Sequence, residues 1–419
     1  MKRLYVFALS LCIAGCGLRL PGKGKGAVPE PVKPSGVNAS AENTTTYLPG
    51  SDDLSYSRYR KEAARIAASL DDSLLAAQVL ITGLDGNNYL GDEMKAILKD
   101  VPSGGIMLFR YNLNSGKDEI KSFLDECSSY VASLSGITPF MAVDHEGGLV
   151  HRFNSEVEKL PPAASYWDTA LEEGWEKALG LIECSARRSA LEIHSLGITM
   201  NFAPVAEVLD EKNALFIETR SYGPDSDFVR DAASAFIRGM DAAGIACVIK
   251  HFPGNTEDDP HFNAPVLNAD KITLDRMTGP FAGIIGNLRP PCLMVSHALV
   301  PVMDSRKIAS LSHRILKGWL RDEIGFEGVI IADDFSMEAA ARASEQAAVE
   351  ALAAGADMVM AWPSNARAVH RAVMKALEEN SLSRERLLEA AGRILTEKLR
   401  YGIVPTEAGE SGQARPSKK

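Results

Sequence analysis

Eight short apolar runs, separated by longer segments with helical periodicity, restrict the fold of this chain more than any other feature. The runs occupy residues 78–81, 105–109, 140–143, 198–202, 247–249, 292–295, 328–331 and 357–360. Such uninterrupted runs are typical of parallel strands that are covered on both faces. Between two of them, apolar residues recur every three or four positions, as on one face of a helix, at Phe228, Ala232, Ala235, Phe236 and Met240.

Eight strand-then-helix units predict an α/β fold, a (β/α)8 TIM-type barrel formed by one catalytic domain over residues 53–404. The alternative is an open, doubly wound sheet. A dinucleotide-binding sheet of that kind would carry a glycine-rich phosphate fingerprint after its first strand, and the segment 82–85 (Thr-Gly-Leu-Asp) lacks it. The barrel is therefore the favoured fold.

The N-terminus has the parts of a bacterial secretion signal. Lys2 and Arg3 precede an apolar run over residues 4–14, which is too short to span a bilayer. The following Ile-Ala-Gly-Cys ends at Cys16 and resembles the lipobox of bacterial lipoproteins, in which the cysteine becomes lipidated. We expect a signal peptide at 1–15 and an extracytoplasmic protein held to the membrane through Cys16, on the periplasmic or cell-surface side. A plain secretory signal with an incidental cysteine is the alternative.

Residues 16–52 and 405–419 read as a lipid-anchored flexible linker and a flexible tail, because the stretch after Cys16 is rich in small and polar residues and lacks apolar periodicity. Apart from Cys12 in the signal peptide and Cys16, the chain has four cysteines, and their spacing is not that of a metal site. They are Cys127, Cys184, Cys247 and Cys292. Cys247 and Cys292 lie in apolar runs and are predicted to be buried thiols.

The charge balance argues against a nucleic-acid partner. The formal net charge is -10, and no basic stripe interrupts the body of the chain. Nucleic-acid binding depends on clustered lysine and arginine. We therefore expect no nucleic-acid partner.

Polar residues follow the apolar runs in one unit after another. In a barrel of this type the carboxyl ends of the strands meet at one mouth, where the chemistry gathers. We therefore expect a shared cleft to contain Asp144, Lys250, His251, His297, Asp333 and Asp334.

Several motifs around these positions form a recognisable set. They are residues 250–254 (Lys-His-Phe-Pro-Gly), 259–261 (Asp-Pro-His), 331–337 (Ile-Ala-Asp-Asp-Phe-Ser-Met), 144–153, 201–205 (Asn-Phe-Ala-Pro-Val) and 220–223 (Arg-Ser-Tyr-Gly). Together they resemble the β-N-acetylglucosaminidases of glycoside hydrolase family 3, and the similarity covers nearly all of residues 53–404. The sequence departs from the family pattern at Asn255-Thr256, where the family has His-Gly, and at Leu149, where it has arginine. The first departure predicts a shortened catalytic loop.

Glycoside hydrolysis with retention needs a nucleophilic carboxylate on one face of the sugar and a proton donor on the other. Asp333 follows an apolar run and matches the family nucleophile. The alternative role for such an aspartate, capping the next helix, describes Asp334 better. The resemblance implies that His261, oriented by Asp259, is the acid/base. An imidazole with a pKa of ~6.5 suits both proton transfers near neutral pH. A solvated loop in which the two residues are merely close is the alternative.

Five residues match sugar-hydroxyl binders of the family, in which charged groups hydrogen-bond to a ring of hydroxyls. They are Asp144, Arg152, Arg220, Lys250 and His251. Arg152 and Arg220 could instead form structural ion pairs with neighbouring acids. His297 is left open between a residue that supports the site and a satisfied core histidine.

The resemblance implies a retaining β-N-acetylhexosaminidase that needs no cofactor or metal and releases terminal β-linked N-acetylglucosamine. Because export is expected, peptidoglycan fragments such as muropeptides are the first choice of substrate and chitin-like oligosaccharides the second. Two alternatives remain: a non-catalytic surface lipoprotein built on a hydrolase barrel, and a metal-dependent barrel hydrolase.

Overall fold

The computed structural model describes residues 49–154, 157–258, 265–336 and 344–405. The chain divides into two compact units, Met1–Leu48 and Pro49–Lys419, and all described residues belong to the second. Cys16, Asp259 and His261 lie outside the described residues. The predictions for these three residues therefore rest on the sequence.

Eight parallel strands form one sheet in the order β10-β1-β2-β3-β4-β5-β6-β9. A parallel bridge between Ile331 and Met358 joins β9 to β10 and closes the sheet. The strands are β1 (Leu80–Gly83), β2 (Gly105–Leu108), β3 (Phe140–Val143), β4 (Met200–Asn201), β5 (Ala246–Phe252), β6 (Cys292–Val295), β9 (Val329–Ala332) and β10 (Val359–Ala361). Each predicted apolar run overlaps one strand, so the predicted (β/α)8 barrel is confirmed.

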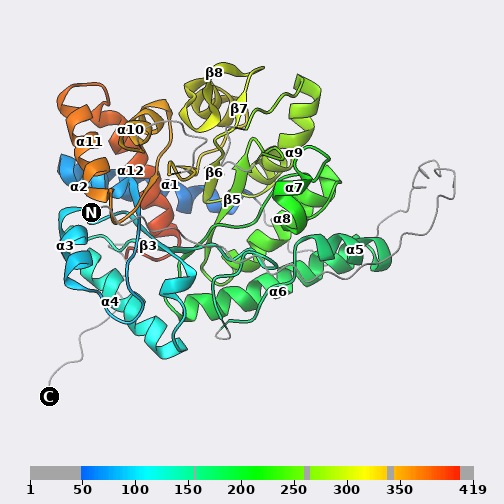
Figure 1. The fold of residues 1–419 in the computed structure, drawn as a ribbon, viewed down its shortest axis with the longest axis horizontal. Coiled ribbons are helices and arrows are strands. Elements are labelled where there is room, and N and C mark those ends of the chain that lie inside the picture. The colour runs from blue at the N-terminus through cyan, green and yellow to red at the C-terminus, as the bar shows by residue number, and fades with distance from the viewer. Residues whose placement is uncertain (1–48, 155–156, 259–264, 337–343, 406–419) are drawn as a thin grey trace, which may run out of the picture. The chain divides into compact units, whose positions relative to one another are not determined.

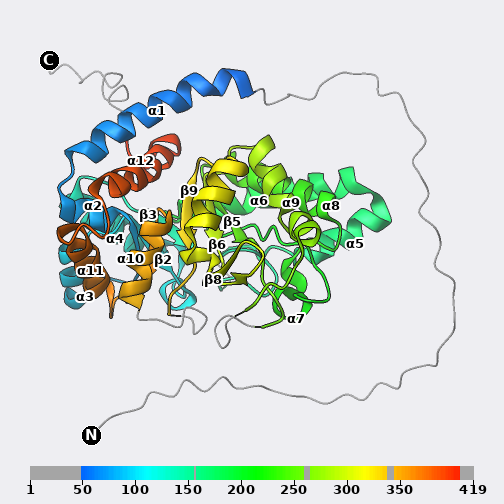
Figure 2. The same cartoon turned by 90° about the horizontal axis from the view of Figure 1, so that it is seen from above.

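Helices surround the strands, as Figures 1 and 2 show. The helices are α1 (Pro49–Ser69), α2 (Asp72–Gln78), α3 (Asp92–Asp100), α4 (Lys117–Ser135), α5 (Ala164–Glu173), α6 (Trp175–Ser195), α7 (Ala214–Ile217), α8 (Ser226–Asp241), α9 (Lys271–Asn287), α10 (Ser344–Ala354), α11 (Ala366–Glu378) and α12 (Arg384–Arg400). Shorter or irregular helical segments are η1 (Arg110–Asn112), η2 (Glu218–Arg220), η3 (Ala309–Leu311) and η4 (Arg314–Glu323). Helix α1 lies beside α12 at one end of the barrel (Figure 2).

The burial pattern explains why these residues form these elements. Every residue of β1, β2, β3, β6 and β9 is buried, as expected for strands that side chains and helices cover on both faces. In α8 the five residues of the predicted apolar face are all buried. Asp225 caps this helix by accepting a hydrogen bond from the Phe228 amide at 2.8 Å. Cys247 and Cys292 are buried thiols, as predicted.

A hairpin after β6 interrupts the repeating pattern and was not predicted. Its strands are β7 (Leu299–Val300) and β8 (Asp304–Ile308), which pair antiparallel. One strand has two residues and the other is largely polar and exposed, so neither gives the apolar run that marks the barrel strands.

Buried charges fix the amino-terminal end of the barrel, opposite the mouth. Asp357, just before β10, is fully buried and accepts hydrogen bonds from Arg321, from Arg386 at 2.8 Å and from Arg393 at 3.1 Å. Burial alone would raise the pKa of Asp357, but the three guanidinium charges outweigh it and hold the pKa below its usual value. This cluster ties the last strand to η4 and α12. Among the described residues, no helix is both long enough and apolar enough to cross a membrane.

Candidate active site

Asp144 is the first residue after β3 and lies between two cations. Its Oδ1 accepts from Lys250 Nζ at 2.8 Å, and its Oδ2 accepts from Arg152 Nη2 at 3.0 Å. Burial favours the neutral acid, but the charges of Lys250 and Arg152 hold the pKa of Asp144 below its usual value. The structure therefore brings together three of the predicted sugar-binding residues, with Asp144 ionised as an acceptor.

Glu146 joins the same network from the next turn of the chain. It accepts two hydrogen bonds from Arg220, both at 2.8 Å, and lies 2.7 Å from Lys250 Nζ. Burial opposes its ionisation, yet the charges of Lys250 and Arg220 hold the pKa of Glu146 far below its usual range. Glu146 was not among the predicted site residues, although it lies inside the motif 144–153. The sequence signal that could have identified Glu146 was a second acidic residue two positions after the predicted binder Asp144.

Two glycines allow the chain to turn sharply after Glu146. Gly147 and Gly148 both have positive φ, at 96° and 52°, and a Cβ on Gly147 would lie 2.5 Å from the Pro161 carbonyl oxygen. The turn is closed by a bridge between Gly147 and Val150. Leu149, where the family has arginine, is at its tip and is 65% exposed. The turn thus delivers Arg152 back to Asp144 while leaving Leu149 to solvent.

Both predicted arginines form ion pairs with neighbouring acids, Arg152 with Asp144 and Arg220 with Glu146. This is the arrangement that the structural alternative expects. It does not exhaust the donors of Arg152, because its Nε is buried and has no partner among the described residues.

Glu207 forms a second hydrogen-bonded group, beside His251. It lies six residues after β4, is 2% exposed, and its Oε1 is 2.6 Å from His251 Nδ1. The same carboxylate accepts from the Asn255 amide at 2.6 Å and from Asn255 Nδ2 at 2.9 Å. Because the carboxylate accepts at Nδ1, it fixes the ring of His251 with Nε2 as the free edge. Glu207 was also missed, and its sequence signal was a charge two residues after the motif 201–205.

The departure from the family pattern begins within this group. Asn255 stands where the family has histidine, and its amide and side chain both bind Glu207. Gly254, directly before it, has a φ of 137°, which turns the chain away from β5. The loop that carries Asp259 and His261 therefore starts from a fixed point, although both residues lie outside the described part of the chain.

Asp333 is the first residue after β9 and is 9% exposed. Its backbone amide donates to the Val295 carbonyl at 3.1 Å, and its Oδ1 accepts from the Asp334 amide at 2.8 Å. Asp334 instead accepts from the Ser336 amide at 2.8 Å, a local bond two residues along the chain. The helix-capping role suggested for Asp334 stays a prediction, because the residues directly after Ser336 lie outside the described part of the chain. Asp333 is thus held at the mouth through Oδ1, which accepts from the Asp334 amide, and Oδ2 takes no part in that bond. This geometry suits the predicted nucleophile.

His297 lies at the end of β6 and supports the chain next to Asp333. Its Nδ1 is 2.8 Å from Ser310 Oγ, its Nε2 is 3.0 Å from the Asp334 carbonyl oxygen, and its ring stacks on Phe335 at 4.9 Å. A carbonyl oxygen only accepts, so Nε2 is the donor to Asp334, and in the neutral ring Nδ1 then accepts from Ser310. Both ring nitrogens have partners, as expected for a satisfied core histidine, and one partner belongs to the residue after Asp333, as expected for a residue that supports the site.

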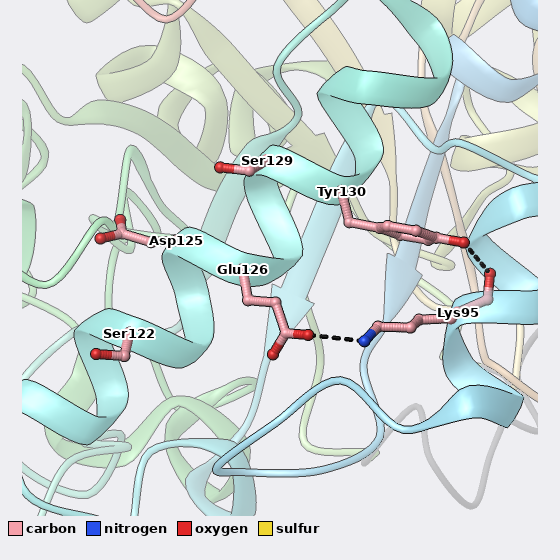
Figure 3. A pocket seen from close by; sticks show the side chains of 6 residues that line it. All are labelled: Lys95, Ser122, Asp125, Glu126, Ser129 and Tyr130. Carbon is pink, nitrogen blue, oxygen red and sulfur yellow. Dashed lines mark hydrogen bonds and ion pairs between the residues drawn. The ribbon is translucent and has the colours of Figure 1, made fainter.

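A surface groove of about 650 Å³ lies away from the mouth, between α3 and α4 on the outside of the barrel (Figure 3). Lys95 pairs there with Glu126 at 2.9 Å, and the Tyr130 hydroxyl donates to the Lys95 carbonyl at 3.2 Å. These contacts join two neighbouring helices. Within the described ranges, no group of three or more histidine, cysteine, aspartate or glutamate side chains has the geometry to hold a metal ion.

Comparisons with known proteins identify the family. The glycosyl hydrolase family 3 N-terminal domain matches residues 74–397. A β-hexosaminidase of Methylococcus capsulatus is 34% identical over 292 residues, which cover 67% of this chain and 81% of that protein.

Two solved structures have the same fold. A family 3 β-N-acetylglucosaminidase of a Paenibacillus species superposes with a TM-score of 0.75 at 27% identity, covering 84% of this chain and 65% of that one. A β-N-acetylhexosaminidase of Beutenbergia cavernae superposes with a TM-score of 0.70 at 25% identity, covering 79% of this chain and 99% of that one. This chain thus spans slightly less than two thirds of the Paenibacillus protein but nearly all of the Beutenbergia one. It belongs to glycosyl hydrolase family 3.

Proposed function

We propose that this chain is a retaining β-N-acetylhexosaminidase that releases terminal, non-reducing β-linked N-acetylglucosamine. The relatives named above are β-hexosaminidases and β-N-acetylglucosaminidases. The observation that carries the proposal is the position of Asp333 at the end of β9, at the same mouth as the Asp144–Lys250 pair. A nucleophilic carboxylate and an acceptor for sugar hydroxyls are the two groups that this reaction needs first.

In the proposed first step, an oxygen of Asp333 attacks the anomeric carbon of the bound sugar. The bond from that carbon to the leaving-group oxygen breaks, and His261 donates a proton to this oxygen. Asp259 orients the imidazole and stabilises its charged form. In the second step, water attacks the same carbon, His261 takes its proton, and the bond to Asp333 breaks. The sugar leaves with its original anomeric configuration.

The binding roles follow from the network described above. Asp144 is held ionised by two cations, so it can accept hydrogen bonds from hydroxyls, and Arg152 fixes one of its carboxylate oxygens. Lys250 and Arg220 fix the two carboxylates, and His251 presents its Nε2 edge because Glu207 occupies Nδ1. A rigid and charged wall of this kind positions a sugar without rearranging during the reaction.

The substrate and location form the finer part of the proposal. The lipobox at Cys16 supports a lipoprotein outside the cytoplasm, anchored to the membrane by its acyl chains. Outside the cytoplasm, peptidoglycan fragments are the N-acetylglucosaminides that we place first, and chitin-like oligosaccharides second. No nucleic-acid partner is expected from the acidic composition.

The experiment that tests the proposed function compares nitrophenyl β-N-acetylglucosaminide with nitrophenyl β-glucoside, using the same enzyme preparation with and without a strong chelator. We expect release of nitrophenol from the first substrate, much less from the second, and no effect of the chelator. Failure to cleave either substrate would favour the non-catalytic lipoprotein. Loss of activity in chelator would favour the metal-dependent hydrolase.

A further inference from the structure

Three aromatic side chains form a row along one half of the barrel mouth. Trp362 follows β10 directly, Phe109 follows β2 directly, and Tyr111 lies in η1 just beyond it. The rings of Trp362 and Phe109 are 5.1 Å apart and tilted by 45°. Those of Phe109 and Tyr111 are 5.9 Å apart and nearly parallel. We call Trp362, Phe109 and Tyr111 the aromatic row.

The backbone is shaped to accommodate the row. Gly83 ends β1, between β10 and β2, and a Cβ there would lie 2.7 Å from Trp362 Cε3. Real Cβ atoms essentially never approach a ring so closely, so only glycine lets the indole lie against the end of β1. The absence of a side chain at Gly83 therefore leaves the space that the ring of Trp362 occupies.

The outer end of the row is fixed as well, although it faces solvent. The Tyr111 hydroxyl donates to the Leu84 carbonyl at 3.0 Å, and Asn112 Nδ2 donates to the same oxygen at 2.8 Å. Arg110 Nη2 reaches the His151 carbonyl at 2.5 Å and so ties η1 to the loop after β3. Tyr111 nevertheless remains 46% exposed. A half-exposed aromatic ring that is held in place by a hydrogen bond is suited to stacking on a ligand.

The inner end of the row adjoins the predicted nucleophile. Trp362 Nε1 donates to Asp334 Oδ1 at 3.2 Å, and the Asp334 amide donates to Asp333 at 2.8 Å. We call the charged residues that follow β3 and β4 or lie on β5 the charged wall; they are Asp144, Glu146, Arg152, Arg220, Lys250 and His251. The aromatic row instead follows β10 and β2, the two strands that flank β1 in the other half of the strand order. One half of the mouth thus offers charged groups for hydroxyls, and the other offers aromatic faces.

We propose that the aromatic row is the binding subsite for the ring of the leaving group, the second sugar of the substrate. This inference rests on the proposed function and adds the part of the substrate that the family motifs leave open. A pyranose ring has a rim of hydroxyls and a face of C–H groups, and the C–H face packs on aromatic rings. The first sugar occupies the charged wall, so the second sugar extends from the scissile bond along Trp362 and Phe109 toward exposed Tyr111.

The test uses two substrates that share the first sugar and have an alkyl alcohol as leaving group. These are methyl β-N-acetylglucosaminide, which has no second ring, and the β-1,4-linked disaccharide of N-acetylglucosamine. The readout is the ratio of kcat/KM for the disaccharide to kcat/KM for the methyl glycoside. A change that disturbs Asp333 or the charged wall lowers both values and leaves this ratio unchanged.

We expect Tyr111→Leu and Trp362→Leu each to lower the ratio by up to about tenfold, the upper range for one aromatic contact. Trp362→Phe and Tyr111→Phe keep an aromatic ring, so each should retain most of the wild-type ratio. Trp175→Leu is the matched control, because Trp175 is a partly exposed aromatic residue on α6 outside the row. Tyr111→Leu alters a half-exposed side chain, so it keeps the test valid if Trp362→Leu fails to fold.

The outcomes separate this inference from the proposed function. Wild-type enzyme that cleaves both substrates, with a ratio that neither leucine variant changes, would overturn the aromatic subsite and leave the proposed function standing. Wild-type enzyme that cleaves neither substrate would overturn the proposed function, and the subsite with it. A lowered ratio in both leucine variants, restored by phenylalanine, would support the subsite.

Discussion

Lys250 and Glu146 form a buried ion pair at the mouth of the barrel, with Nζ 2.7 Å from the carboxylate and side chains that are 3% and 5% exposed. The same lysine also binds Asp144, and the same glutamate also binds Arg220. Each charge is therefore compensated by another, and removing one would leave a buried ion without its partner.

Glu146→Gln should lower the free energy of unfolding by about 3 kcal/mol or more, because Lys250 and Arg220 would lose the charge that compensates them. The loss should be visible at neutral pH in urea titrations and should shrink below about pH 4.5. The pKa of Glu146 is lowered on folding, so its contribution is present above the unfolded pKa and disappears on acidification. Glu158→Gln is the control. It breaks the exposed pair with Arg188, which should contribute at most about 1 kcal/mol. Equal effects of the two changes would refute the buried network.

Buried charges on α12 give a second, pH-dependent prediction. Lys398 is fully buried, and burial lowers its pKa to about 7, although Nζ donates to Gln78 Oε1 at 3.1 Å. Between about pH 7 and 10.5 the unfolded chain binds more protons than the folded chain, so stability rises with pH across that window. Lys398→Met should therefore stabilise the protein most at pH 6 and least near pH 10. Since a change of one pKa unit corresponds to about 1.4 kcal/mol, the gain at pH 6 should be a few kcal/mol. Lys375→Met, at an exposed position, should show no such trend. A gain from Lys398→Met that is constant with pH would show that the lysine is not neutral when folded.

The neighbouring Glu397 should act in the opposite direction. Burial raises its pKa to about 7, and it accepts a hydrogen bond from Tyr56 at 3.1 Å. The folded chain then binds more protons than the unfolded one between about pH 4.5 and 7, so its contribution to stability is lost as pH rises through that range. Glu397→Gln should flatten this part of the stability profile, measured by thermal unfolding in a series of buffers. An unchanged slope would contradict the raised pKa.

The eight strands could be predicted from the sequence because each one is buried on both faces and so consists of an apolar run. The β7–β8 hairpin could not, since β7 has only two residues and β8 is largely polar and exposed. Glu146 and Glu207 were missed for a different reason. Each lies in or beside a predicted motif, but its role depends on contacts with Arg220 and His251, 74 and 44 residues away in the chain. Only the closed barrel brings such pairs together.

The aromatic row could not be predicted from the sequence either. Phe109 ends the predicted run 105–109 and Trp362 lies two residues after the predicted run 357–360, so both could be placed near the mouth. Their ring contact depends on β10, β1 and β2 being neighbours, and on Gly83 leaving room for the indole. Strand order in a closed sheet and the space above a glycine are properties of the fold rather than of any local pattern.

The lipobox predicts that the mature protein partitions into detergent, since a lipidated cysteine with two or more acyl chains anchors stably, whereas one chain is marginal. Cys16→Ser should move the protein to the aqueous phase in a detergent phase-separation experiment. Cys184→Ser, which removes an exposed thiol of the barrel domain, should not. Unchanged membrane association of Cys16→Ser would show that the cysteine is incidental.

The acid/base pair is tested by substrates that differ in leaving group. If His261 donates the proton and Asp259 orients it, His261→Ala should lose roughly 10²–10⁴-fold on a disaccharide, whose leaving group needs that proton. Activated aryl glycosides should lose much less, and Asp259→Asn should show the same selectivity. His313→Ala, at an exposed histidine, is the control. Equal losses on good and poor leaving groups would make His261 a binding residue rather than the acid. Unchanged activity in both variants would mean that the shortened loop does not supply the proton.

The most direct test of Asp333 as the nucleophile is the hydrolysis of nitrophenyl β-N-acetylglucosaminide by wild-type enzyme and by Asp333→Asn, with thermal unfolding measured on the same samples. Asp118→Asn, an exposed change on α4, serves as the control. We expect wild-type enzyme and the Asp118 variant to release nitrophenol, and we expect Asp333→Asn to unfold at a similar temperature but to show only background release. Near wild-type hydrolysis by folded Asp333→Asn would contradict the role of Asp333 as the nucleophile.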